Sequence, residues 1–140
     1  NTFASNSNLQ IVRILSDNIN IEVNAVPIKK IITSNDTFQD NWEENCFSSY
    51  SIVYYNKKVY EVDSILYIYD ESNLIASVLG YTDTIIDLVI PDTVMINEIT
   101  YKVESIEAEA FNGNKDLKTI VLGNNVLYIK ESAFRNCTNL

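Results

Sequence analysis

Two copies of one pattern, 23 residues apart, occupy the C-terminal part of this sequence. Ile106, Ala110, Phe111 and Leu117 recur as Ile129, Ala133, Phe134 and Leu140. A period between about 20 and 50 residues is typical of repeat proteins, in which each unit buries its apolar face against a neighbouring unit. The sequence therefore predicts a repeat architecture that acts through a broad surface.

A third copy lies near the N-terminus, at an offset of 108 residues. Phe3, Leu9, Val12 and Ile14 recur there as Phe111, Leu117, Ile120 and Leu122. Because 108 is not a multiple of 23, the middle of the chain must hold something other than these repeats. Within the later array, Leu88 and Ile90 align with Ile120 and Leu122, and an insertion from Met95 to Val103 predicts a loop or an extra hairpin.

The remaining segments are rich in strand-forming residues. Strands are predicted at 19–23 and 31–33, a capping helix from Ser34 or Asp36 through Asn41, a hairpin of 52–55 with 59–62, and further strands at 65–69 and 74–79. The fold class that follows is a β-rich α/β solenoid with parallel strands. It includes short helical turns around 110–111 and 133–134, and an antiparallel insertion near 52–80.

Composition excludes several function classes. The 140 residues carry a formal net charge of −9, which argues against binding nucleic acid or an anionic membrane. There is no histidine, the commonest general base and metal ligand. No apolar run approaches the roughly 20 residues that span a bilayer. We therefore expect no catalytic residues, no cofactor, no metal and no membrane insertion by this chain.

Three groups of side chains are candidates for a functional role. Tyr54, Tyr55, Tyr60, Tyr67 and Tyr69 suit a ligand-contacting face, although each position also suits plain strand packing. Glu98, Glu104, Glu107 and Glu109 could suggest paired carboxylates, but nothing in the sequence supplies an apolar pocket for them. Cys46 and Cys137 are predicted to be unpaired and structural, with a disulfide as the alternative for Cys46.

The repeat residues resemble the BspA-type leucine-rich repeat family. The motif stands as Ile129-Lys-Glu-Ser-Ala-Phe134-Arg-Asn-Cys137-Thr-Asn-Leu140 and as Ile106-Glu-Ala-Glu-Ala-Phe111-Asn-Gly-Asn114-Lys-Asp-Leu117. It departs from the family pattern at Glu107 and Lys130, where the family favours glycine, and at Asn114, where it favours cysteine. The resemblance implies that residues 1–52 close one array with a cap and that residues 53–140 enter a second array. The pattern is cut at both ends, which predicts a longer parent.

The resemblance also implies a function. It predicts a secreted or cell-surface module, not an enzyme, that binds an extracellular or host-surface protein or promotes adhesion. The competing hypotheses are a carbohydrate-binding module that uses the tyrosines and a structural spacer that displays another domain. We also hypothesise that an open repeat face at Leu140 drives head-to-tail self-association.

Overall fold

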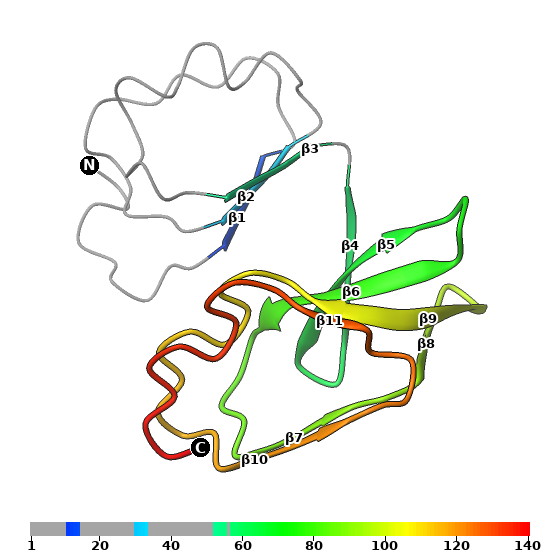
Figure 1. Ribbon diagram of the computed structural model, residues 1–140. Coiled ribbons are helices and arrows are strands. Elements are labelled where there is room, and N and C mark those ends of the chain that lie inside the picture. Colours follow the sequence, from blue (N-terminus) through cyan, green and yellow to red (C-terminus); the bar gives the residue numbers. More distant parts are fainter. Residues whose placement is uncertain (1–10, 15–29, 34–51, 56) are drawn as a thin grey trace, which may run out of the picture. The chain divides into compact units, whose positions relative to one another are not determined.

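A computed structural model describes residues 11–14, 30–33, 52–55 and 57–140 of the chain (Figure 1). The chain divides into two compact units, residues 1–57 and 58–140. In the first unit, β1 (Ile11–Ile14), β2 (Lys30–Thr33) and β3 (Ile52–Tyr55) form a parallel sheet in that order. The predicted strand at 19–23 and the predicted capping helix at 34–41 lie outside the described residues. That two arrays and a cap underlie the two units stays a prediction.

The predicted hairpin of 52–55 with 59–62 is wrong. β3 pairs in parallel with β2, whereas β4 (Lys58–Val62) pairs with β5 (Ile65–Asp70) in an antiparallel hairpin. The two residues that join β4 to β5, Asp63 and Ser64, have φ values of 50° and 63°. Two consecutive positive φ angles make the tight turn whose twist matches the flanking strands, so the chain reverses at Asp63 and Ser64.

The second unit is built around a six-stranded sheet. β5 and β6 (Ile75–Tyr81) are antiparallel, as predicted, and β9 (Ile99–Ile106) joins β6 in parallel. The short β11 (Tyr128–Ile129) adds to β9, giving the order β11-β9-β6-β5-β4. β8 (Thr93–Ile96) also pairs with β9 across the turn at Asn97 and Glu98, which confirms that the insertion forms an extra hairpin.

A second, two-stranded parallel sheet carries the repeat. β7 (Asp87–Ile90) and β10 (Thr119–Leu122) pair with Leu88 opposite Ile120 and Ile90 opposite Leu122, which confirms the alignment made from the sequence. Each strand is followed by a corner. A Cβ atom added at Gly123 would lie 2.6 Å from the backbone nitrogen of Asp92, so the two corners approach one another as closely as glycine allows.

The predicted helical turns around 110–111 and 133–134 are not helices. The backbone N–H groups of Ala110, Asn112 and Asn114 donate to the carbonyl groups three residues earlier, and Glu109 and Gly113 have positive φ values of 56° and 77°. The intervening N–H groups of Glu109, Phe111 and Gly113 donate instead to the carbonyl groups of Glu131, Ala133 and Arg135. In a helix these three N–H groups would point along the helix axis to carbonyl groups of the same segment. Here they bond to the next repeat instead, so the segment does not form a helix.

The core of the second unit includes a column of three aromatic rings. Phe111 is fully buried, with its ring centroid 5.5 Å from that of Tyr81 and 5.3 Å from that of Phe134. Both pairs are nearly parallel, at 8° and 3°. The prediction that Phe111 and Phe134 lie one above the other in adjacent repeats is confirmed. In Figure 1 the two segments that carry them, coloured yellow-orange and red, run side by side.

Phe111→Ala should lower the free energy of unfolding by about 3 to 5 kcal/mol, because it removes the middle ring of the column and leaves a cavity between two layers. Phe134→Ala is the matched control, and it should cost less because, among the described residues, a ring stacks on one side of Phe134 only. Urea denaturation followed by tyrosine fluorescence and circular dichroism measures both. Equal losses in the two variants would contradict the central place of Phe111.

Candidate functional site

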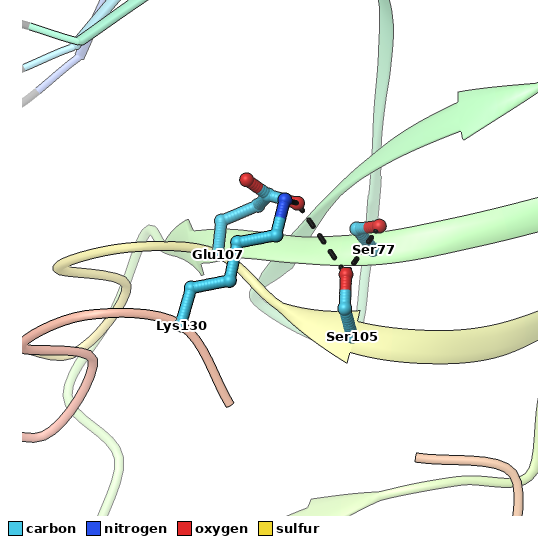
Figure 2. Close-up of polar contacts among 4 residues, drawn as sticks. All are labelled: Ser77, Ser105, Glu107 and Lys130. Atoms are coloured by element: carbon cyan, nitrogen blue, oxygen red, sulfur yellow. Dashed lines mark hydrogen bonds and ion pairs between the residues drawn. The ribbon is translucent and has the colours of Figure 1, made fainter. Parts of the chain in front are cut away.

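Four polar side chains meet between the repeats (Figure 2). The Lys130 Nζ lies 2.7 Å from the Glu107 Oε1, and the Ser105 Oγ lies 3.4 Å from the same oxygen. The Ser105 Oγ also lies 2.7 Å from the Ser77 Oγ. Since a hydroxyl group carries one proton, Ser105 donates to either Glu107 or Ser77 at any moment, and Ser77 donates to Ser105 in the first case. We call these four residues the inter-repeat cluster.

Strand pairing brings the inter-repeat cluster together. Ser77 on β6 is in register with Ser105 on β9, and Ile129 on β11 is in register with Ile106 on β9. Glu107 and Lys130 are the residues that directly follow Ile106 and Ile129, so they are neighbours in adjacent repeats. The two residues at which this sequence replaces the family's glycine therefore form one ion pair.

Burial makes this ion pair different from an ordinary surface pair. Glu107 is only 7% exposed, whereas the Lys130 side chain is half-exposed. A carboxylate that leaves water without a partner costs several kcal/mol, and a cation at hydrogen-bond distance offsets much of that cost. Lys130 thus lets a charged residue occupy a position inside the stack, and its own ammonium group remains partly open to solvent.

The chemistry of the inter-repeat cluster does not resemble a catalytic centre. Ser105 is buried, and the Glu107 carboxylate, the proton acceptor within reach of its hydroxyl group, is held in an ion pair with Lys130. Of the four glutamates considered from the sequence, only Glu107 enters the cluster, and Glu98 lies at the tip of the β8–β9 hairpin. No group of three or more acidic or cysteine side chains is placed to hold a metal within the described ranges.

The structure separates the tyrosines predicted to contact a ligand. Tyr67 lies in the core, where burial, with the nearby Asp63 carboxylate second, raises the pKa of its phenol to about 12. Its cross-strand partner Tyr60 is exposed, and Tyr69 is half-buried with its ring edge against Tyr101. The side chains of Tyr54 and Tyr55 lie outside the described part of the structure. Tyr67 is therefore unavailable at the surface, and ligand contact by the other four stays a prediction.

Exposed valines on the parallel sheet were missed by the sequence reasoning. Val89 on β7 and Val121 on β10 are register partners, and each is 59% exposed. Beside them the Thr119 Oγ1 donates to the Asp87 Oδ1 at 2.5 Å, so the polar pair is satisfied within the sheet. Successive side chains of a strand point to opposite faces of the sheet, so the side chain of Val89 points away from the face on which Leu88 and Ile90 are buried. We call the face that carries Asp87, Val89, Thr119 and Val121 the outer face.

Cys137 has a structural environment. The structure records it as a free cysteine, and its Sγ donates to the Phe111 carbonyl oxygen at 3.0 Å in the neighbouring repeat. Asn114, at the equivalent position one repeat earlier, uses its Oδ1 to accept from the backbone N–H groups of Asp116 and Leu117. Burial raises the pKa of the Cys137 thiol. The prediction that Cys137 is unpaired is confirmed, and Cys46 lies outside the described residues.

Comparison with known proteins bears directly on the repeats. Residues 82–140 match the family described as a BspA type leucine-rich repeat region (6 copies), which confirms the resemblance noted in the sequence. A leucine-rich repeat protein from Bacteroides ovatus ATCC 8483 is 29% identical, with a TM-score of 0.54, over 58% of this chain and 22% of that chain. No curated protein matches the chain.

A second solved structure is similar at a lower level. It is a leucine rich cell surface protein from Faecalibacterium prausnitzii A2-165, 21% identical over 59% of this chain and 29% of that chain, with a TM-score of 0.45. This chain thus spans less than a third of either neighbour. In the described part of the chain, no helix is long and apolar enough to cross a bilayer.

Lys130→Met should lower the free energy of unfolding by about 1 to 3 kcal/mol, because it leaves the buried Glu107 carboxylate without its cation. Glu107→Gln should cost less, since the neutral amide still accepts a hydrogen bond from Lys130. Lys118→Met, at an exposed lysine with no ion pair among the described residues, is the control. Urea denaturation checks all three, and a Lys130→Met protein as stable as the Lys118→Met control would contradict the role of the pair.

The Cys137 thiol should react with iodoacetamide at a higher pH in the folded protein than in the urea-denatured protein. The raised pKa of the thiol means that the reactive thiolate forms later as the pH increases. A Cys46→Ser variant isolates the signal from Cys137. Identical midpoints of the rate against pH in the two states would contradict the burial argument.

Proposed function

We propose that this chain, whose residues 82–140 match the BspA-type leucine-rich repeat family, is part of a non-enzymatic module that binds a protein partner at a cell surface. The observation that carries the proposal is the outer face, where Val89 and Val121 stand side by side in solvent. Strand residues that point away from a core are usually polar, so paired exposed valines on adjacent repeats favour a contact surface.

The geometry of the outer face suits a protein partner. Parallel strands in register repeat the same side-chain directions from one layer to the next, so further repeats would extend the face into a continuous strip. The hydrogen bond between Thr119 and Asp87 leaves the valines flanked by a satisfied polar pair. An apolar centre with a polar border is the usual composition of a protein interface.

Charge and location complete the proposal. A formal net charge of −9 favours partners with a basic surface, and such binding weakens as salt rises. The extracellular or cell-surface location and the adhesive role come from the family. Among the described tyrosines of the predicted contact set, Tyr60 alone has a clearly exposed ring, and one ring gives little support to a carbohydrate-binding platform.

Binding of the chain to immobilised extracellular matrix proteins tests this function, with serum albumin as the acidic control surface. The neutral double variant Val89→Ser/Val121→Ser should weaken binding about tenfold or more, because it removes the apolar centre of the contact. Met95→Ser is the matched control, since Met95 is an exposed apolar residue on β8 and not on the outer face.

Three results would contradict the proposal. These are binding to albumin as strong as to the matrix proteins, an equal loss in the Met95→Ser control, and reproducible turnover on glycoside, ester or peptide substrates. Binding that is independent of salt and selective for glycans would replace the proposal with the carbohydrate alternative.

A further inference from the structure

The irregular segment between β9 and β10 contains a chemically labile pair of residues, Asn112 and Gly113. The sequence places an asparagine directly before a glycine here and nowhere else. Asparagine amides are thermolabile, and a following glycine has no side chain to shield its backbone nitrogen from the amide. Asn112 is half-buried and Gly113 is exposed, and among the described residues nothing lies within 4 Å of a Cβ atom built on Gly113. Water and hydroxide therefore reach this pair from the surface.

The next repeat layer holds both groups that would react with one another. The Gly113 N–H donates to the Arg135 carbonyl oxygen at 2.7 Å, which engages its proton and fixes the direction of the nitrogen. The Asn112 Oδ1 accepts from the Asn136 Nδ2 at 3.4 Å, a weaker contact that holds the side-chain amide toward the same layer. The nitrogen and the amide carbon are thus kept apart by their bonds to residues 135 and 136.

Release of this layer would allow a reaction that needs only hydroxide and water. The Gly113 nitrogen gives its proton to hydroxide and forms a bond to the Asn112 Cγ, the bond from Cγ to Nδ2 breaks, and the amide nitrogen leaves as ammonia. The product is a cyclic succinimide. Water then opens the ring, giving aspartate when the new bond breaks and isoaspartate when the original backbone bond breaks. The net change is the exchange of ammonia for water.

We propose that Asn112 is a deamidation site whose reaction is controlled by the contact between the two repeat layers. The amide is protected while residues 130–140 stay bonded to residues 109–114. Each local opening of this contact exposes the amide, because segments of a folded protein open separately without global unfolding. Deamidated molecules are then those whose layers have separated. The site includes no residue of the outer face and does not rest on the proposed function.

The isoaspartate product would weaken the contact that protected the asparagine. In isoaspartate the main chain runs through the Cβ and Cγ atoms of residue 112. This adds a methylene carbon between the N–H group that bonds within the turn and the N–H group that bonds to Arg135. The added atom displaces the Gly113 N–H from its acceptor, as a shift of register does in a sheet. Aspartate keeps the length of the main chain, so it should disturb the contact less.

Incubation of the full chain in mildly alkaline buffer tests the proposal, with aspartate and isoaspartate at residue 112 measured over time by peptide mapping and mass spectrometry. A synthetic peptide of residues 108–117, which has no second layer, gives the unprotected rate. The folded chain should deamidate about tenfold or more slowly than the peptide, and the urea-denatured chain should match the peptide. Asn112→Gln is the control for the assignment, because the longer side chain forms its ring far more slowly.

Variants that weaken the layer contact should react faster. Phe134→Ala removes the ring stacked on Phe111. Lys130→Met removes the ion pair with Glu107. Both should raise the rate at the site above that explained by the globally unfolded fraction, which circular dichroism measures, and if the first variant fails to fold the second decides. Met95→Ser, on β8, should leave the rate unchanged.

Three results would overturn the proposal. These are a folded chain that deamidates as fast as the peptide, a peptide that does not deamidate, and layer variants whose corrected rates equal that of the unmodified chain. The isoaspartate form, separated by chromatography, should exchange the amide hydrogens of Glu109, Phe111 and Gly113 faster than the unmodified chain does. Equal exchange would contradict the weakening of the contact.

Discussion

The hydrogen bonds that pass from one repeat layer to the next hold the C-terminal half of this molecule together. In residues 109–114 each backbone N–H group donates either to a carbonyl group of its own turn or to a carbonyl group of the neighbouring layer, and the two uses alternate. The aromatic column of Tyr81, Phe111 and Phe134 stacks at the same places. The backbone hydrogen bonds and the ring contacts join the same pairs of adjacent repeat layers. The register of these layers therefore determines how the core side chains pack.

That register also explains how a charged residue comes to lie inside the stack. Glu107 and Lys130 occupy equivalent positions, so two charged residues can lie there without repulsion only when their charges are opposite. Ser105 and Ser77 add polar contacts on the neighbouring strands. A polar group between layers is tolerated when each member has a partner, and it then fixes which layers can be neighbours.

The sequence predicted the repeats because equivalent apolar residues in the two repeats are separated by a constant offset. The alignment of Leu88 with Ile120 and the stacking of Phe111 on Phe134 both follow from offsets that can be read directly. It failed where partners are chosen by distant segments: β3 has good strand residues, but nothing local says that it joins β2 and not β4. The outer face was detectable from the alternation at Val89, whereas the ion pair of Glu107 with Lys130 needed the layer register, which only the assembled strands provide.

The alternation of amide groups sets a rule on chain length. Inserting a single residue between Glu107 and Asn114 would exchange the amides that bond within the layer with those that bond across it, and the inward ring at Phe111 would turn outward with them. This irregular segment is thus as strict about residue number as a β-strand. The corners between strands tolerate inserted residues, as the added β8–β9 hairpin shows. Variation in the length of such a chain is therefore confined to its corners, and its turns change only in composition.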